Sequence, residues 1–107
     1  MSISAQELNQ ALGEYIQTFP NESRLNAYLA SNPSSQSHAE IKSELSAVVK
    51  TTEEFLWAQP SGVSWSGAFE DQLFTHIRSR HSWLERQAFS TLLGFSKWLC
   101  WHEGLNA

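Results

Sequence analysis

Residues 37–58 read SHAEIKSELSAVVKTTEEFLWA and carry the most regular hydrophobic pattern in the chain. Their apolar side chains return every three or four positions, which places them on one face of a helix that turns by about 100° per residue. Ser37 and Glu40 have the capping-box spacing, in which the two side chains satisfy free backbone amides at the start of a helix. These features predict one long amphipathic helix that continues towards Ala58, with an inward stripe formed by Ile41, Leu45, Val48, Val49, Thr52, Phe55 and Leu56.

Two shorter helices are predicted on the N-terminal side of this segment. Ser4 and Glu7 repeat the capping-box spacing, and Pro20 stops the helix that follows. Asn21 is suited to cap a second helix, which ends before the Asn32–Pro33 pair because the residue before a proline is pushed out of helical geometry. Both helices have apolar sets at helical spacing, namely Leu8, Ala11, Leu12, Tyr15, Ile16 and Phe19 in the first and Leu25, Tyr28 and Leu29 in the second.

An irregular connection and a fourth helix are predicted after the long helix. Residues 59–67 contain a proline, two glycines and three serines, so the regular backbone breaks there. We expect Val63 and Trp65 to fold back onto the core from this connection. A helix over 68–79 follows, with an inward set formed by Phe69, Leu73, Phe74 and Ile77.

The last predicted helix has a wider apolar surface than the others. Ser82 and Glu85 form a third capping box, and the helix reaches about His102 before Gly104. Its central stripe consists of Leu84, Ala88, Leu92, Phe95 and Leu99. Three tryptophans widen the stripe on one side, namely Trp83, Trp98 and Trp101, and two further apolar residues lie beyond its other edge, namely Phe89 and Leu93. A helix that is apolar over so much of its circumference is either central to the fold or partly covered by another molecule.

Taken together, these patterns predict an all-α fold, a small single-domain bundle of about five helices over residues 1–107. No alternating, β-branched run bounded by turns occurs, so no sheet is expected. The two longest helices, centred on Val48 and Leu92, should pack against each other, with the N-terminal pair covering one side.

Composition and net charge limit the classes of binding partner and the cellular locations that we expect for this chain. A formal net charge of −4 argues against broad electrostatic capture of nucleic acid or anionic lipid, which needs a surplus of lysine and arginine. The uncharged stretch near the end, 87–96, is far shorter than the roughly 20 apolar residues that span a bilayer, so we expect no membrane segment. Residues 1–7 lack the basic start and apolar run of a secretory signal, and a single cysteine cannot form an internal disulfide, so we expect a cytoplasmic location.

The chain contains no convincing catalytic or metal-binding motif. Residues 62–66 resemble a nucleophile elbow, but that motif needs a glycine where this chain has a serine. Cys100 and His102 point about 200° apart on a helix, so they cannot share a metal there. His76 and His81 straddle a predicted turn without carboxylate or cysteine companions at a metal spacing. We therefore expect no cofactor, no metal and no catalysis, and we interpret the cysteine as a buried apolar filler.

The tryptophans carry the sharper functional hypothesis. Trp57 lies outside the stripe of its own helix, while Trp98 and Trp101 widen the stripe of the last one. Together they predict an apolar patch rimmed by Arg86 and Lys97, and tryptophan and arginine are enriched at protein–protein hot spots. The alternative is that the tryptophans complete the core of a small protein, and the sequence leaves both interpretations open.

A basic turn carries a second hypothesis. Residues 76–86, HIRSRHSWLER, hold three of the seven lysines and arginines of an acidic chain. The candidates for phosphate contact beside the start of the last helix are Arg78, Arg80, His81 and Arg86. The simpler interpretation, which we favour, is that the arginines pair with acidic neighbours, namely Glu70, Asp71 or Glu85.

The leading hypothesis from the sequence is a non-enzymatic protein-interaction module. Such an adaptor, regulator or inhibitor would bind another protein, or a second copy of itself as a homodimer, through the aromatic last helix. The alternative is a weak nucleic-acid or phosphate binder that uses the basic turn 76–86. An enzyme ranks third because a nucleophile, a base and an orienting group cannot be named together.

Overall fold

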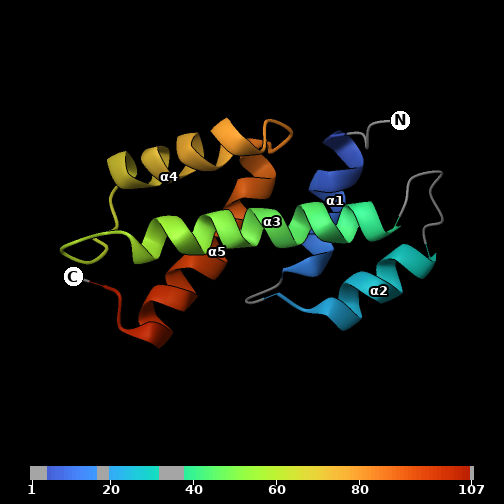
Figure 1. Cartoon of the computed structure of the whole chain (residues 1–107), viewed down its shortest axis with the longest axis horizontal. Coiled ribbons are helices and arrows are strands. Elements are labelled where there is room, and N and C mark those ends of the chain that lie inside the picture. Colours follow the sequence, from blue (N-terminus) through green and yellow to red (C-terminus); the bar gives the residue numbers. More distant parts are fainter. Residues whose placement is uncertain (1–4, 17–19, 32–37, 107) are drawn as a thin grey trace.

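The computed structural model describes residues 5–16, 20–31 and 38–106 and contains five helices in that part of the chain. They are α1 (Ala5–Tyr15), α2 (Glu22–Ser31), α3 (His38–Trp57), α4 (Gly67–Arg80) and α5 (Arg86–Glu103). Figure 1 shows a small bundle, and the β pairing among the described residues is limited to two isolated bridges. The prediction of an all-α bundle of about five helices is confirmed.

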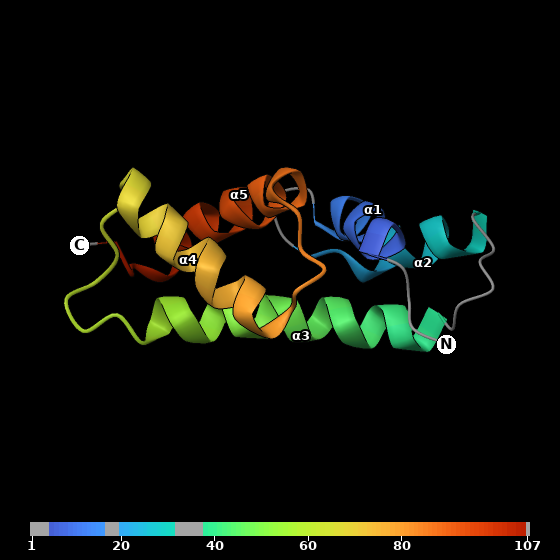
Figure 2. The ribbon, with the colours of Figure 1, turned by 90° about the horizontal axis from the view of Figure 1, so that it is seen from above.

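The central helix of the bundle is α3, which runs along most of the long axis of the molecule (Figures 1 and 2). The principal extents are 44 × 25 × 19 Å. Figure 2 shows α4 and α5 over one half of α3 and α1 and α2 over the other half. As predicted, α3 and α5 pack against each other; α1 contacts both of them, and α2 packs on α1.

The inward face of α3 forms the middle of the core. Its buried side chains are Ile41, Leu45, Val48, Val49, Thr52 and Leu56, and burial of each large aliphatic one stabilises the fold by about 1.5–3 kcal/mol. The Thr52 hydroxyl donates to the Val48 carbonyl at 2.8 Å, so its burial leaves no donor unpaired. Phe55 is half-buried on the flank instead, where its ring centroid lies 5.7 Å from that of Phe69 and 4.8 Å from that of His76.

The last helix begins later than the sequence predicts, at Arg86. Ser82 lies before it, and Glu85 is the N-cap residue without a capping hydrogen bond from its side chain. A residue of α1 takes over this role: Asn9 donates from Nδ2 to the Trp83 carbonyl at 2.8 Å and accepts at Oδ1 from the Glu85 amide at 2.9 Å. A tertiary contact therefore takes the place of part of the predicted capping box, because Asn9 accepts from the Glu85 amide, the donor that the Ser82 side chain would have satisfied.

Two other helix ends follow their local signals. Ser66 precedes α4, and its hydroxyl oxygen accepts from the Phe69 amide at 3.2 Å. Gly104 closes α5 with a φ of 70°, a left-handed conformation that glycine adopts without a steric penalty. The start of α4 and the end of α5 therefore lie within one or two residues of their predicted positions.

The first helix ends before Pro20, where the sequence predicts its end. Its last residue is Tyr15, and the carbonyl of Tyr15 accepts from the Asn21 amide at 2.7 Å. The Asn21 side chain in turn accepts from the Arg24 amide at 3.1 Å, as expected for a cap. The other predicted features of these helix ends lie outside the described residues, namely Ser4, Phe19 and Ser37.

The C-terminal segment crosses the connection between α3 and α4. The Val63 amide donates to the Leu105 carbonyl at 2.8 Å, and the Trp65 indole donates to the Asn106 side chain at 3.1 Å. Val63 is buried, and the Trp65 ring meets Phe69 edge-on at 5.3 Å between centroids. The predicted return of this connection onto the core is therefore confirmed.

Candidate functional site

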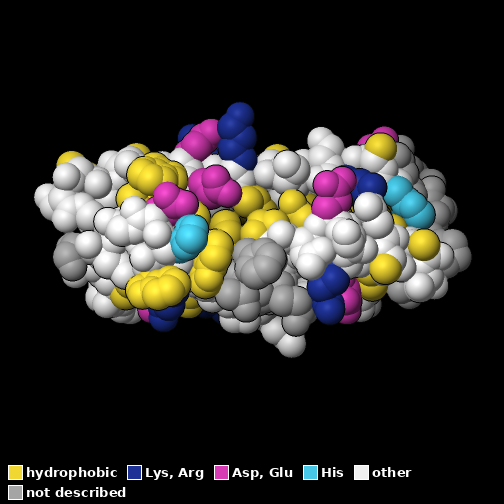
Figure 3. Space-filling view, turned by 90° about the horizontal axis from the view of Figure 1, so that it is seen from below, with side chains coloured by type: hydrophobic (Ala, Val, Ile, Leu, Met, Phe, Trp, Pro, Cys, Tyr) yellow, Lys and Arg dark blue, Asp and Glu magenta, His cyan; other side chains and the backbone are white. Residues whose placement is uncertain are grey.

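The C-terminal ends of α3 and α5 lie at the same end of the molecule (Figures 1 and 2). Trp57, the last residue of α3, is 54% exposed, and Trp101, in the last turn of α5, is 73% exposed. Within the described part of the chain, these two are the large hydrophobic residues that remain exposed. Figure 3 shows hydrophobic side chains gathered at this end, with a histidine and acidic side chains among them.

Trp98 and His102 complete this aromatic surface. The two rings stack with centroids 4.9 Å apart and planes inclined by 9°, and Trp98 also stacks on Phe95 at 6.4 Å. Side chains three or four residues apart share a side of a helix, so Trp98 lies on the same side of α5 as both Trp101 and His102. We call Trp57, Trp98, Trp101 and His102 the tryptophan face. It unites the three tryptophans that the sequence singled out with a histidine that it did not.

The two basic residues predicted to rim this patch lie in different places. Lys97 turns towards α4, where its Nζ lies 3.4 Å from Glu70 Oε2 and 5.7 Å from the centre of the Trp65 ring. Arg86 begins α5, about 18 Å along the helix axis from Trp98 at 1.5 Å per residue. Lys97 therefore stays close to the tryptophan face but is paired elsewhere. Arg86 does not border the face, because it lies at the opposite end of α5 from the tryptophans on that helix. The predicted rim is corrected at this residue.

Carboxylates surround the tryptophan face instead. Glu53 and Glu54 come four and three residues before Trp57, on the same side of α3. Glu103 Oε1 lies 3.9 Å from His102 Nε2. Burial raises the pKa of Glu53 above its usual value. We call Glu53, Glu54 and Glu103 the acidic rim, and the site thus combines indole rings with negative charge.

Two of the three arginines of the basic turn, Arg78 and Arg86, contact other side chains of the protein. Arg86 Nη2 lies 2.8 Å from Asp71 Oδ1, and its guanidinium sits 4.6 Å from the centre of the Phe74 ring. The guanidinium of Arg78 lies 5.8 Å from the same ring, while Arg80, the last residue of α4, is exposed. The ion pair between Arg86 and Asp71 is one of the pairings that the simpler interpretation of this turn expected.

His81 lies inside the protein rather than on the surface of the basic turn. It is 7% exposed, with Nδ1 3.0 Å from Glu44 Oε1 and Nε2 2.9 Å from Thr51 Oγ1. The same Glu44 oxygen accepts from the Trp83 indole at 2.8 Å. We call Glu44, Thr51, His81 and Trp83 the His81 junction. Because both ring nitrogens are engaged there, His81 does not join Arg78 on an open phosphate-binding surface, and this part of the prediction is corrected.

The His81 junction also sets the charge of Glu44. The hydrogen bond from His81 lowers the pKa of this carboxyl most, burial opposes it, and the bond from Trp83 lowers it further. Sequence reasoning missed Glu44 because its partners lie on other elements, 37 and 39 positions away. The one local signal is its place next to Leu45, at the edge of the buried stripe of α3.

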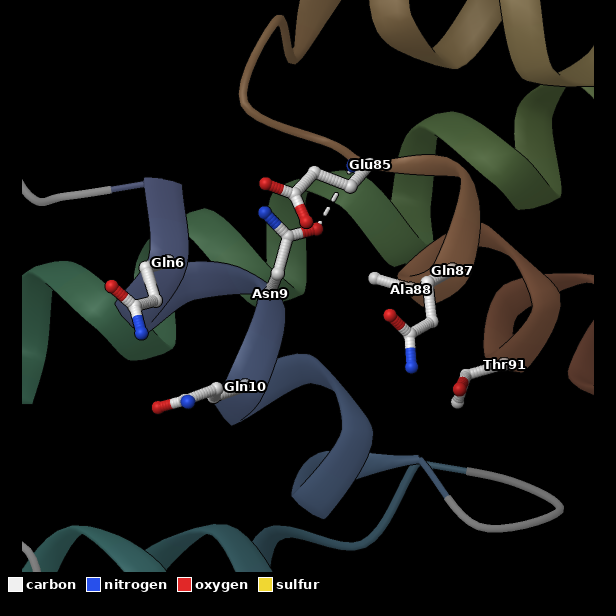
Figure 4. A pocket seen from close by; sticks show the side chains of 7 residues that line it. All are labelled: Gln6, Asn9, Gln10, Glu85, Gln87, Ala88 and Thr91. Carbon is white, nitrogen blue, oxygen red and sulfur yellow. Dashed lines mark hydrogen bonds between the residues drawn. The ribbon is translucent and has the colours of Figure 1, made fainter.

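A pocket of about 360 Å³ lies between α1 and the start of α5 (Figure 4). It was not predicted, and neutral amides dominate its lining: Gln6, Asn9, Gln10, Glu85, Gln87, Ala88 and Thr91. Asn9 is already used to hold the turn before α5, as the dashed line in Figure 4 shows. Glu85 is the one ionisable side chain of this lining, and the other polar groups are neutral donors and acceptors of hydrogen bonds.

The described residues also bear on metal binding and thiol chemistry. They hold no cluster of three or more metal-binding side chains. Cys100 is buried, and burial raises the pKa of its thiol, which makes the reactive thiolate less accessible. No helix among 5–16, 20–31 and 38–106 is both long and apolar enough to cross a bilayer. No protein-family model, curated protein or solved structure matches this chain significantly, so the site is interpreted from its own geometry.

Proposed function

We propose that this chain is a non-enzymatic protein-interaction module, an adaptor, regulator or inhibitor that binds another protein or a second copy of itself through the tryptophan face. The observation that carries the proposal is the exposure of Trp57 and Trp101, at 54% and 73%, at one end of the bundle. A large aromatic side chain buries about 150–250 Å² when it is covered, and tryptophan is enriched among residues that dominate binding energy.

The core does not require these two indoles. Leu56, directly before Trp57, is 1% exposed, and Cys100, directly before Trp101, is fully buried. Leu56 and Cys100 therefore belong to the core at the ends of α3 and α5, whereas the two indoles that follow them are more than half exposed. This arrangement supports docking rather than completion of the core.

The tryptophan face is also partly ordered before binding. Trp98 is held between Phe95 and His102, so one indole is fixed by contacts within α5. A preordered aromatic surface loses little side-chain freedom on association, which favours affinity. As part of the proposal we place this binding in the cytoplasm, because the single cysteine is buried and free.

The double variant Trp57→Ala/Trp101→Ala tests the proposal. We expect it to keep the helical circular dichroism and unfolding midpoint of the wild type, and to lose partner capture from the native cell and any self-association in sedimentation velocity. Trp65→Phe is the matched control, because it changes a tryptophan packed on α4 and keeps an aromatic ring there. A folded double variant that retains every captured protein and the wild-type mass would show that the tryptophan face is not the docking surface.

A further inference from the structure

The carboxylates beside the tryptophan face have few cations of their own. Within the described residues, the acidic rim has one ion-pair partner within 4.0 Å, His102, which lies 3.9 Å from Glu103. Lys97 is paired with Glu70 on the α4 side. Lys50 lies one turn of α3 before Glu53 and Glu54, on the same side of the helix, and forms no ion pair within 4.0 Å with either of these described residues. The acidic rim, with three carboxylates against one neighbouring lysine, therefore leaves an excess of negative charge beside the exposed indoles.

One of these carboxylates is partly desolvated. Glu53 is half-buried, and burial raises its pKa because the charged form loses water contacts. A cation brought by a partner would restore favourable interactions to this group. An arginine has a second reason to bind here, since its flat guanidinium stacks on indole rings and donates two parallel hydrogen bonds to a carboxylate.

We propose that the partner of the tryptophan face is an arginine-bearing amphipathic segment of another protein, whose apolar side chains cover Trp57 and Trp101 while its arginines pair with the acidic rim. This inference rests on the proposed function and names the class of its partner. Charge complementarity selects this class: the site offers apolar rings bordered by Glu53, Glu54 and Glu103, on a chain with a net charge of −4.

A second copy of the chain fits the same surface less well. In a two-fold dimer, a patch meets the same patch of its partner, so the acidic rim of one copy would approach that of the other. Like charges brought together at an interface cost binding energy, and the net charge of −4 on each copy adds to the repulsion. A basic segment meets neither obstacle.

Two synthetic helical peptides of equal length and identical leucine stripe test this inference, one with arginine and one with glutamate on the polar face. Binding of each labelled peptide to the full chain is measured by fluorescence anisotropy at low and at physiological salt. We expect the arginine peptide to bind at least about tenfold tighter, and salt to reduce this advantage because it screens exposed charges. We expect Trp57→Ala/Trp101→Ala to weaken its binding at least about tenfold as well.

Variants of the acidic rim test whether its carboxylates cause the preference for the arginine peptide. Glu53→Gln/Glu54→Gln should remove most of the preference for the arginine peptide, because it removes two carboxylates of the rim. Glu22→Gln/Glu85→Gln is the matched control: it changes the net charge equally at the starts of α2 and α5 and should leave the preference intact.

Several outcomes would overturn the inference. Equal binding of both peptides that still depends on Trp101 would refute the charge preference and leave the proposed function standing. Equal loss of preference in the control variant would reduce the effect to net charge. Tryptophan-dependent dimerisation without any peptide would identify a second copy as the occupant. Absence of binding by either peptide would reject this partner class, whereas the capture experiment judges the proposed function separately.

Discussion

At the His81 junction a half-buried indole, a buried imidazole and a partly exposed carboxylate are joined by hydrogen bonds, whereas at the tryptophan face the same three kinds of group lie at the surface. In the junction, Glu44 accepts hydrogen bonds from both Trp83 and His81. At the face, the indoles of Trp57 and Trp101 make no hydrogen bond to a described residue, and they remain mostly exposed. The difference indicates that an acceptor on a neighbouring helix, rather than the aromatic residue itself, distinguishes the half-buried indole of Trp83 from the exposed indoles of Trp57 and Trp101.

Removing the Glu44 carboxylate from the His81 junction should lower the stability of the protein most strongly. Glu44→Ala leaves the His81 and Trp83 donors without their partner, and each unsatisfied donor costs about 1–3 kcal/mol. Because water reaches part of this carboxylate, we expect a total loss of about 2–3 kcal/mol in the free energy of unfolding, measured in urea. Glu54→Ala, on the open side of α3, should change it by less than about 0.5 kcal/mol. Equal effects of the two variants would remove the contrast between the regions.

Removing the contact between α1 and the turn that contains Trp83 should also lower the stability of the protein. Asn9→Ala removes both hydrogen bonds that hold the turn containing Trp83, and loss of a helix-capping contact costs about 1–2 kcal/mol. Gln10→Ala is the control, because Gln10 also lines the amide pocket and makes no such contact with the turn. Denaturant titration of both variants measures the difference. A wild-type midpoint for Asn9→Ala would mean that the turn before α5 holds itself.

Acidification should change the contributions of Glu44 and Glu53 to the unfolding free energy in opposite directions. The pKa of Glu44 is lower in the folded protein than its ordinary value of 4.5, so its stabilising effect is full above that pH and is lost as the pH falls through the folded pKa. Glu53 has a raised pKa, so burial of its charge opposes folding at neutral pH and this cost disappears on acidification. We therefore expect Glu44→Gln to flatten the acid decline of the unfolding free energy and Glu53→Gln to steepen it. Parallel pH profiles for the three proteins would contradict this assignment.

Truncation of an open indole should have the smallest effect on stability. Trp101→Ala removes a side chain that is 73% exposed, so we expect a change within about 0.5 kcal/mol in the unfolding free energy. Thermal and urea unfolding of the variant measure it. A loss as large as that of Glu44→Ala would assign Trp101 to the core and withdraw the tryptophan face.

Periodicity was sufficient to predict the helices, because a buried stripe repeats every few residues along one segment. The inward stripe of α3 from Ile41 to Leu56 follows this rule. The predicted cap at Asn21 also forms, because it depends only on residues close by in the sequence. The start of α5 did not follow it. Ser82 and Glu85 have capping-box spacing, but Asn9 satisfies the backbone there, and no pattern within residues 82–85 contains that contact.

The candidate site was predictable only in part for the same reason. Trp57 falls outside the stripe of its own helix, and its exposure follows from that position. Whether Trp98 is stacked, Lys97 is paired or His81 is buried depends on which helices meet. Such contacts join distant parts of the chain, so a single sequence indicates the residue types but not their pairings.

The Asn9 contact has a consequence for the order of folding. Its two hydrogen bonds join residues that are 74 and 76 positions apart. Contacts between distant segments form slowly because a long loop must close first. The backbone just before α5 thus gains these partners only when α1 has docked against it, so the start of α5 becomes fully hydrogen-bonded late in folding, after both ends of this long loop have met.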